Sequence, residues 1–480
     1  MRKTDPGVPV TVVGGGLAGC EAAWTLARLG FDVDLIEARG GDGAAPDNGA
    51  SAPWQSPELA ELVCSNSLKS DDPARPTGLL KRELARLGSL LIPLAREHAV
   101  GAGTALAVDR GRFARAVTAA IAGNGRIRLV REEVTAIPEG PSILATGPLT
   151  RPALAQAIAA AVGGDGLYFY DAIAPVVDAD SLDMGLAFPA SRWGRENRGG
   201  DAAGDGDDAG GGDEAGGGDE AGGDYLNCPM DREEYEAFVE AIATADKVAP
   251  RAFEEPRYFE NCSPVELMVE RGRDVLRYGP LRPIGLVDPR TGARPWAVVQ
   301  LRMENRHRTA YNLVGCQTRM TYPAQERVFR LIPALREARF LRLGEVHRNT
   351  YVDAPRRLEE GLFLPGRPHT ALSGLLCGVE GYVESMALGL YSALRLAARL
   401  RGVPFEEPPV TCALGALAWH IRHAPAPYMP TNVHLGLWPP LQVKGRLPKA
   451  EKRRMLAERA AADFDAWFAA GAGFPVEVPT

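Results

Sequence analysis

The hydrophobic pattern near the N-terminus changes its period twice within a short stretch. Val10 to Val13 form a run of β-branched residues, which predicts a buried parallel strand. The run breaks at a group of glycines, and residues 20–30 (CEAAWTLARLG) then space their apolar positions as a helix does. Phe31 to Ile36 form the next strand pattern. Strand, glycine turn, helix and strand together predict one dinucleotide-binding unit.

Three glycines in this turn have the spacing of a dinucleotide fingerprint. Gly14 suits the tight turn, Gly16 lets the backbone approach a pyrophosphate, and Gly19 lets the helix pack closely on the strand. Glu37 ends the second strand about 20 residues beyond the glycines, where an acid accepts from ribose hydroxyls and favours FAD or NAD. The cofactor-binding residues predicted in this unit are Gly14, Gly15, Gly16, Leu17, Ala18, Gly19 and Glu37.

Two later glycine segments are predicted to join the same site. Residues 142–148 form an apolar strand that ends in Thr146-Gly147, and such a strand lays its glycine beside the nucleotide in flavoproteins with two dinucleotide domains. A long helical pattern over residues 375–400 opens at Gly378, Val379, Glu380, Gly381 and Tyr382. The unpaired N–H groups at the start of that helix suit a ligand oxygen or the polar edge of a flavin. Close helix packing is the alternative explanation for these glycines.

The rest of the pattern predicts an α/β protein, with a Rossmann-type FAD-binding domain and an inserted α/β domain. Short strands and turns alternate over residues 276–313, which indicates an antiparallel sheet in the insertion. We expect residues 1–176 and 342–480 to form the FAD-binding domain and C-terminal helices, and residues 177–341 to form the inserted substrate domain. Smaller expectations are a short helix at 58–63, a surface helix at 78–94, and strands at 126–130 and 133–137.

Composition places the chain among ordinary soluble proteins. It has 480 residues, of which 45% are hydrophobic and 24% charged, and it lacks an apolar run long enough to span a membrane. The net charge of −7 is concentrated in residues 199–224, which carry nine acidic and no basic residues. A loop at 194–224 is therefore expected to be disordered. The N-terminus has no apolar signal core, so we expect a cytoplasmic protein.

Seven scattered cysteines without a CxxC pair argue for reduced thiols and against a disulfide frame or a structural metal site. Cys64 lies in a polar Cys-Ser-Asn-Ser cluster after an apolar segment, and its composition favours a small turn over a reactive site. The predicted insertion carries a set of cationic and aromatic residues: Arg277, Arg282, Arg302, Arg306, His307, Arg308, Arg319, Tyr278, Trp296 and Tyr311. A solvated sheet face and an RNA-binding surface both account for this set.

Longer blocks of the chain resemble one family. VVGGGLAGCEAAW, AELVCSNSLKS, YLNCPM, FENCSPVELMVERG, YGPLRPIGLVDPRTGARPWAVVQLR, HRNTYVDAP and GVEGYVES are similar, in order, to the TrmFO family of folate- and flavin-dependent tRNA uracil-5-methyltransferases. The resemblance implies that FAD passes a methylene group from 5,10-methylenetetrahydrofolate to carbon 5 of the T-loop uridine of tRNA. It also implies NADH or NADPH as reductant, and it assigns no oligomeric state.

The resemblance also implies site residues. Cys262 in FENCSP matches the family's nucleophile, and Cys64 in LVCSNS matches its second cysteine, the expected base, although which thiol does which stays open. His347 in HRNTY matches the histidine that stacks the folate ring on the flavin, and the glycine segments above fall at FAD positions. Cys228 in YLNCPM lies in a shared block and is expected to be structural.

Departures from the family pattern keep other functions open. The loop after Glu37 lacks the usual histidines, Leu375 replaces a glutamine, and Lys69 replaces an arginine. Methylation of ribosomal RNA by the same chemistry is one alternative. A flavin-bearing RNA-binding or redox protein without methyl transfer is another. The related class that modifies the wobble uridine of tRNA is disfavoured by LVCSNSL, by FENC and by the short C-terminus.

Overall fold

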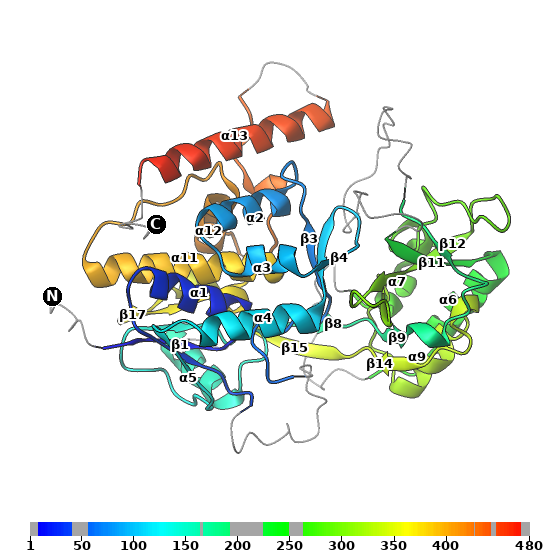
Figure 1. Ribbon diagram of the computed structural model, residues 1–480, viewed down its shortest axis with the longest axis horizontal. Coiled ribbons are helices and arrows are strands. Elements are labelled where there is room, and N and C mark those ends of the chain that lie inside the picture. The colour runs from blue at the N-terminus through cyan, green and yellow to red at the C-terminus, as the bar shows by residue number, and fades with distance from the viewer. Residues whose placement is uncertain are drawn as a thin grey trace.

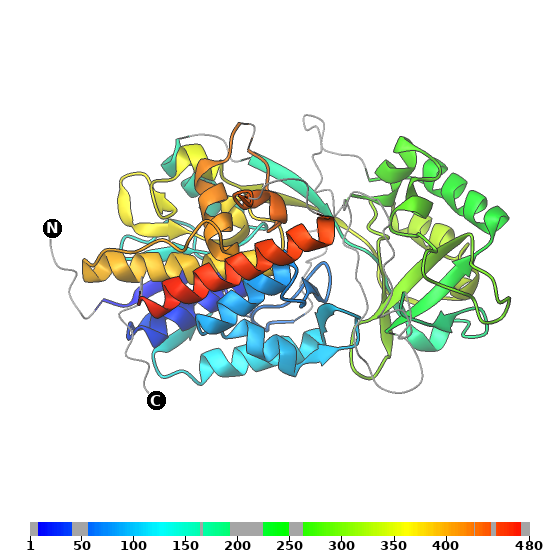
Figure 2. The same cartoon turned by 90° about the horizontal axis from the view of Figure 1, so that it is seen from above.

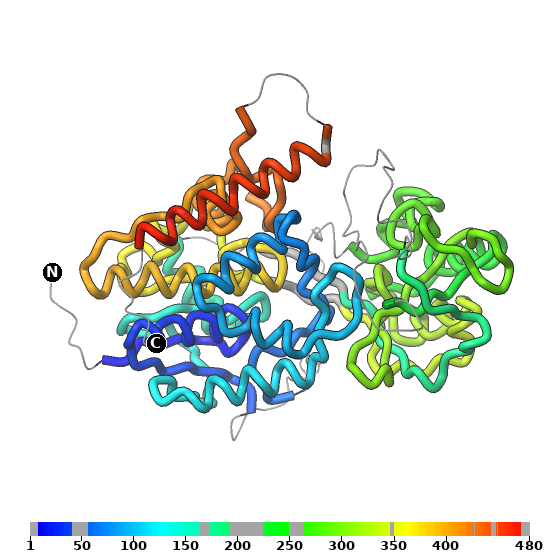
Figure 3. The backbone as a smooth tube through the Cα atoms, turned by 45° about the horizontal axis from the view of Figure 1, so that its top comes forward, coloured from blue at the N-terminus to red at the C-terminus, as the bar shows by residue number. Residues whose placement is uncertain are grey.

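The computed structural model describes residues 8–40, 56–163, 167–192, 224–248, 263–426, 428–442 and 448–471, with only the backbone described at 167–172, 346–349 and 449. Two six-stranded sheets organise these residues. They belong to two lobes, each with its own cluster of buried apolar side chains (Figure 1). Figure 3 shows the second lobe, in green, set off at one end of the molecule.

The first lobe is built on a sheet with strand order β16-β17-β7-β1-β2-β6. Its strands are β16 (Phe363–Leu364), β17 (Arg367–Leu372), β7 (Ser142–Leu144), β1 (Val10–Val13), β2 (Val33–Ile36) and β6 (Ile127–Val130). All neighbours pair in parallel except β16 with β17. The carboxyl ends of four parallel strands, β17, β7, β1 and β2, therefore meet at one edge, where open α/β sheets bind ligands.

Helices and a small sheet cover this parallel sheet. The helices are α1 (Leu17–Arg28), α2 (Pro76–Arg86), α3 (Leu91–Glu97), α4 (Arg110–Ala122), α5 (Pro152–Val162), α10 (Ala354–Arg357), α11 (Tyr382–Arg401), α12 (Ala413–His423) and α13 (Lys449–Ala469), with 3₁₀ turns η5 (Gly374–Cys377) and η6 (Leu435–Leu437). The small sheet has the order β3 (Ser67–Ser70), β5 (Ala105–Val108) and β4 (Ala99–Val100). Seen from above, α13 crosses the first lobe and stays on it (Figure 2).

The second lobe is built on an antiparallel sheet with order β10-β11-β12-β13-β9-β14. Its strands are β10 (Phe188–Pro189), β11 (Tyr225–Met230), β12 (Ala297–Met303), β13 (Ala310–Leu313), β9 (Val176–Asp178) and β14 (Phe340–Arg342). Its helices are α6 (Arg232–Thr244), α7 (Val265–Arg271), α8 (Val275–Tyr278) and α9 (Tyr322–Phe329), with 3₁₀ turns η1 (Ala179–Ser181) and η4 (Pro333–Leu335). A two-stranded antiparallel ribbon, β8 (Leu167–Ala172) with β15 (Val346–Tyr351), connects the lobes (Figure 1).

The α/β class with a Rossmann-type parallel sheet is confirmed. The two lobes follow the order of the predicted domains, whose boundaries stay a prediction. The acidic loop expected at 194–224 lies outside the described residues except for Asp224, which accepts a hydrogen bond from the Gly103 N–H at 2.9 Å.

Three local expectations were wrong, each for a tertiary reason. Residues 58–63 form a turn because Ala60 has a left-handed φ of 51°, which a right-handed helix does not allow, while its N–H bonds the Gly15 carbonyl. Residues 133–137 pair with no strand in the part that the structure describes, so their apolar positions form no sheet. The expected surface helix at 78–94 is two helices, α2 and α3, and α2 is largely buried.

Glu83 shows how α2 is held. Its carboxylate accepts hydrogen bonds from the N–H groups of Ala413 and Leu414, at 2.9 and 2.7 Å, and so caps the start of α12. Burial raises the pKa of Glu83 to about 8, against the opposing effect of those two N–H donors. The capping carboxyl is therefore protonated more readily in the folded protein than in the unfolded chain.

We expect the Glu83 contribution to stability to fall as pH rises. The folded pKa of about 8 exceeds the ordinary value of 4.5, so the contribution is full below pH 4.5 and is lost as pH rises through 8. Glu83→Gln should lower the melting temperature most at pH 5, and the difference from wild type should shrink by pH 8. Thermal melts across this range measure it, with Glu133→Gln at an exposed position as control. A constant difference would contradict the expectation.

Candidate functional site

The glycine turn between β1 and α1 is packed so tightly that two of its glycines have no room for a side chain. Gly14 has a left-handed φ of 105° and donates to the Ile36 carbonyl at 2.7 Å. A Cβ at Gly14 would press on the backbone of Ala145, and a Cβ at Gly19 would overlap the Gly14 carbonyl oxygen. The turn and the helix packing expected of these two glycines therefore have a direct steric cause.

Gly16 differs, because a Cβ there would meet no atom within 4 Å. It is the N-cap of α1, has ordinary extended backbone angles, and no side chain caps the helix. The first N–H groups of α1 thus face open space beside Gly16, which is the cradle that a dinucleotide pyrophosphate requires. Leu17 and Ala18 are buried beneath it, and Ala18 packs against Gly374 and Gly389.

Glu37 lies at the end of β2 beside this turn. One carboxylate oxygen accepts from the Gly15 N–H at 2.7 Å, and the other accepts from the backbone and guanidinium of Arg39 at 2.9 and 3.0 Å. Burial alone would raise the pKa of Glu37, but the Arg39 charge and these donors outweigh it and lower the pKa. Glu37 is therefore an ionised acceptor at the position expected for a ribose. The sequence analysis missed its partner Arg39.

The two other glycine segments lie at the same edge of the sheet. Thr146 and Gly147 follow β7, and Gly147 has a left-handed φ of 71° with open space where a Cβ would lie. The segment from Gly378 to Tyr382 follows β17 and η5 and leads into α11. Its Glu380 N–H donates to the Thr431 carbonyl at 2.6 Å. The structure thus gathers all the cofactor positions expected from sequence around the carboxyl ends of β1, β2, β7 and β17.

Cys64 is brought to the start of α11 by the Tyr382 hydroxyl. The Tyr382 oxygen accepts from the N–H of Cys64 at 2.9 Å and from the N–H of Ser65 at 3.2 Å. The Cys64 sulfur lies 2.8 Å from the same oxygen. The polar turn that composition favoured is therefore real, but its partly buried cysteine also touches a predicted cofactor residue.

Arginines from both lobes hold the Cys64 loop. Arg110 donates to the Leu62 and Val63 carbonyls at 2.9 and 3.2 Å, and Arg342 donates to Val63 at 2.9 Å. Arg302 donates to Ser65 and Asn66 at 2.7 and 2.9 Å. Arg302 and Arg342 belong to the second lobe, so the loop lies where the lobes meet. Arg110 also pairs with Glu304, which follows β12, at 2.6 Å.

Sequence reasoning largely missed the residues that hold the Cys64 loop in place. Arg302 had been grouped with the surface arginines, and Arg110, Arg342 and Glu304 had no assigned task. Arg110 is the first residue of α4, and no local sequence pattern distinguishes it from a solvated arginine.

Two expected site residues are not described in full. Cys262 lies outside the described residues, and its neighbour Ser263 is buried. For His347 the structure describes the backbone, which pairs with Asp171 in the ribbon between the lobes. Cys228, expected to be structural, is fully buried in β11, and burial raises the pKa of its thiol. Cys20, Cys228, Cys316, Cys377 and Cys412 are free thiols, and the described ranges hold no cluster of potential metal ligands.

The cationic set of the second lobe divides into inward and outward members. Arg302 is buried, Arg306 donates to the Glu97 carbonyl at 2.6 Å, and Arg319 pairs with Glu270 at 3.2 Å. Tyr311 is 8% exposed. The RNA-binding interpretation therefore loses Arg302, Arg319 and Tyr311, whereas Arg306 remains exposed. Arg277, Arg282, His307 and Arg308 retain exposed surface.

The exposed and partly exposed side chains of the segment 277–296, here the Tyr278 surface, include Arg277, Tyr278, Ile284, Val287, Arg294 and Trp296. Tyr278, Ile284 and Val287 are 72%, 44% and 60% exposed, which is unusual for large apolar side chains. The Arg277 guanidinium lies 3.7 Å from the centroid of the Trp296 ring. Aromatic faces beside arginines are typical of nucleic-acid contacts.

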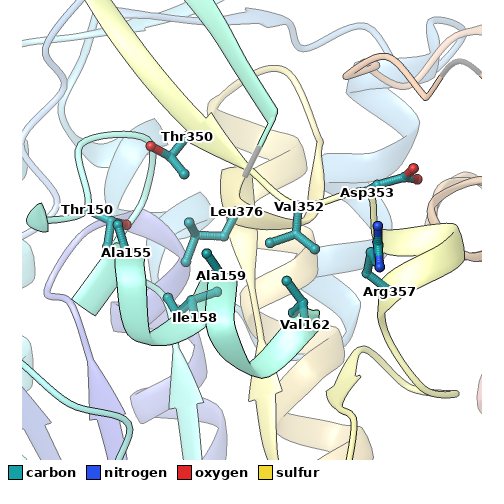
Figure 4. A pocket seen from close by; sticks show the side chains of 10 residues that line it. All are labelled: Thr150, Ala155, Ile158, Ala159, Val162, Thr350, Val352, Asp353, Arg357 and Leu376. Atoms are coloured by element: carbon teal, nitrogen blue, oxygen red, sulfur yellow. The ribbon is translucent and has the colours of Figure 1, made fainter. Parts of the chain in front are cut away.

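A cavity of about 80 Å³ lies between α5 and the segment that follows β15 (Figure 4). Ile158, Val162 and Leu376 contribute apolar walls, and Asp353 and Arg357 lie at one end. None of the residues expected in the active site lines it. Its lining residue Thr150 contacts the hydroxyl of Thr146 at 2.6 Å, so the cavity borders the expected cofactor site. No helix among the described residues has both the length and the apolar character to cross a bilayer.

Comparisons with known proteins agree along nearly the whole chain. The family model for glucose inhibited division protein A matches residues 9–202 and 213–404. A Geobacter sulfurreducens protein named methylenetetrahydrofolate–tRNA-(uracil-5-)-methyltransferase TrmFO is 50% identical over 462 residues, covering 96% of this chain and 99% of its own. A Myxococcus xanthus protein of the same name is 48% identical over 464 residues, covering 95% and 94% of the two chains.

Solved structures show the same fold. Aquifex aeolicus GidA in its form I and form II crystals superposes with TM-scores of 0.64 and 0.63. Each match covers 98% of this chain and 76% or 74% of the GidA chain, at 15% or 14% identity. This likeness supports the α/β fold.

Two alanine substitutions separate the cofactor cradle from the fold. Gly16→Ala should fold normally, since its Cβ meets open space, yet lose bound dinucleotide because the methyl group occupies the pyrophosphate position. Gly19→Ala should lower the melting temperature, because its Cβ overlaps the Gly14 carbonyl. Thermal melts and the cofactor released on denaturation report both. Gly125→Ala, at a position with open space far from the turn, is the control. Full cofactor content in Gly16→Ala would place the dinucleotide elsewhere.

Proposed function

The chain belongs to the TrmFO family, and from this we propose that it methylates carbon 5 of the T-loop uridine of tRNA. The methyl carbon comes from 5,10-methylenetetrahydrofolate, and NADH or NADPH supplies electrons. The observation that supports this most directly is the contact of Cys64 with Tyr382, which joins a thiol to the start of the helix at the glycine cradle. The proposed substrate, tRNA, puts the reaction in the cytoplasm.

FAD fits the residues at the cradle. The open space at Gly16 suits its pyrophosphate, ionised Glu37 suits its ribose, and the glycines before α11 suit the polar edge of its ring. The residues proposed to hold it are Gly14 to Gly19, Glu37, Thr146, Gly147 and Gly378 to Tyr382. When bound, FAD supplies the redox chemistry and the transfer of the one-carbon unit.

Two thiols share the chemistry on uracil in this proposal. Carbon 5 of uracil is a poor nucleophile until a thiolate adds to carbon 6, so Cys262 is proposed to form that sulfur–carbon bond and later to release it. A base must then take the proton from carbon 5, and Cys64 is proposed for this step. His347 is proposed to stack on the folate ring and so to orient it.

The Tyr278 surface is proposed to contact the tRNA. Its exposed tyrosine offers a stacking face, and Arg277 and Arg294 offer positive charge. It belongs to the second lobe, the same lobe that sends Arg302 and Arg342 to the Cys64 loop. An RNA bound to the Tyr278 surface would therefore be bound by the second lobe, which also positions the Cys64 loop.

Methyl transfer tests the proposal. Wild-type protein with labelled methylenetetrahydrofolate, NADH and an unmodified tRNA transcript should place label at the T-loop uridine, mapped by nuclease digestion. Cys262→Ser should abolish transfer, whereas Cys316→Ser, at a buried cysteine of the same lobe, should retain it when folded. Protein that contains reducible FAD but labels no tRNA would refute the proposal, and ribosomal RNA would then be the next substrate to try.

Substitutions in the Tyr278 surface should weaken tRNA binding. Tyr278→Ala should raise the Kd about tenfold, as loss of one stacked base of ~1–3 kcal/mol predicts. Arg294→Ala should reduce the salt dependence of binding by about one counterion. Filter binding at several salt concentrations measures both. Arg454→Ala, at an exposed arginine on α13 that pairs with Glu451 and Glu458, should change neither. Equal affinity of all variants would exclude this surface.

A further inference from the structure

The Tyr382 hydroxyl has three polar neighbours, all within one short loop. The N–H of Cys64 lies 2.9 Å away, the N–H of Ser65 lies 3.2 Å away, and the Cys64 sulfur lies 2.8 Å away. The two backbone groups approach as donors. In the hydrogen bond between the Tyr382 oxygen and the Cys64 sulfur, either atom can be the donor.

Proton counting decides that direction. A phenolic oxygen has two lone pairs and one proton, whereas a backbone N–H only donates. The N–H groups of Cys64 and Ser65 therefore occupy the accepting side of the Tyr382 oxygen. Among the described residues, the Cys64 sulfur is the remaining neighbour within hydrogen-bond distance of that oxygen. If sulfur donated instead, the oxygen would accept three bonds and its own proton would have no acceptor. The hydroxyl thus donates to the sulfur.

The charges around the loop favour the same arrangement. The Val63 carbonyl, next to Cys64, accepts from the guanidinium groups of both Arg110 and Arg342. Burial lowers the pKa of Arg110, but Glu304, Tyr382 and Cys64 raise it more, so its net shift is upward. Burial and the charge of Arg110 lower the pKa of Arg342, yet Glu304, Tyr382 and Cys64 again oppose this. Arg302, which donates to Ser65 and Asn66, is a third cation at the loop, and Glu304 pairs with Arg110.

We propose that Tyr382 is a positioning residue for Cys64: its hydroxyl donates to the sulfur and, with the cations of Arg110 and Arg342, holds Cys64 as a thiolate. A thiolate is an acceptor, which matches the direction found above. Removal of the hydroxyl takes away this hydrogen-bond donor and leaves the arginine charges in place. The hydrogen bond stands without reference to any substrate. Its meaning for catalysis rests on the proposed function, in which a Cys64 thiolate is the base for the carbon 5 proton.

Thiol alkylation tests the proposal without tRNA or folate. Flavin-containing protein is treated with iodoacetamide from pH 5 to 10, and modification of the Cys64 peptide is followed by mass spectrometry. In wild type the rate should reach half its maximum well below the value of about 8.5 for a free cysteine. In Tyr382→Phe this midpoint should move up by about 1–2 pH units, the loss expected for a hydrogen bond to a charged group.

Two further variants keep the result interpretable. Tyr391→Phe removes a buried hydroxyl from the same helix, where it bonds Glu407, and should leave the Cys64 midpoint unchanged. Arg342→Gln removes one cation and should move the midpoint up. The flavin content and melting temperature of each variant show whether it is folded.

The outcomes separate the two proposals. An unchanged or lowered midpoint in folded Tyr382→Phe would overturn the inference, because the sulfur would then be the donor. A raised midpoint in a protein that transfers no methyl group would retain the inference and remove the proposed function. Methyl transfer by the wild type, together with an unchanged midpoint in Tyr382→Phe, would retain the proposed function and overturn the inference.

Discussion

The close approach of α1 and α11 is the constraint on which the site depends. A Cβ at Gly389 would overlap the Ala18 carbonyl, and a Cβ at Gly374 would press on the Ala18 side chain. The absence of both side chains lets α11 lie directly on α1, which itself sits on the sheet through Gly19. Buried contacts of this density tolerate little displacement. The start of α11 is therefore fixed beside the glycine turn, and Tyr382 is carried there with it.

The second lobe also constrains the site, because it fixes the position of the Cys64 loop. Arg302 and Arg342 reach from its antiparallel sheet to the Cys64 loop, and Glu304 balances Arg110 of the first lobe. Such buried polar contacts contribute less to net stability than apolar packing would, but each is directional. The loop is consequently held in one conformation only when both lobes are in place. A change in their relative position would reach Cys64 through the Val63 carbonyl and the side chains of Ser65 and Asn66.

The local parts of this arrangement were predictable from sequence and the tertiary parts were not. Gly14, Gly19 and Glu37 act within one βαβ unit, so spacing alone located them. Cys64 was undecidable from its neighbours, because its partner Tyr382 lies 318 residues away in the chain. The helix expected at 58–63 is absent because Ala60 takes a left-handed φ of 51° where its N–H bonds the distant Gly15 carbonyl. Composition gives the arginine content of the second lobe, but it does not indicate which of these arginines point into the protein. The roles of Cys262 and His347 stay predictions from family resemblance.

Lys69 shows how one substitution alters the balance across this site. The sequence analysis noted only that it replaces an arginine, but its ammonium lies 3.3 Å from one oxygen of the buried Glu384, in the first turn of α11. The Val433 N–H donates to the same oxygen, and the other oxygen of Glu384 has no hydrogen-bond partner among the described residues. An arginine offers a two-pronged donor that suits both carboxylate oxygens, whereas a lysine acts as a point charge. The buried ammonium of Lys81 also interacts electrostatically with Glu384. Glu384 and Tyr382 share the first turn of α11, so Lys69 and Lys81 act on the same helix start that carries the Tyr382 hydroxyl to Cys64.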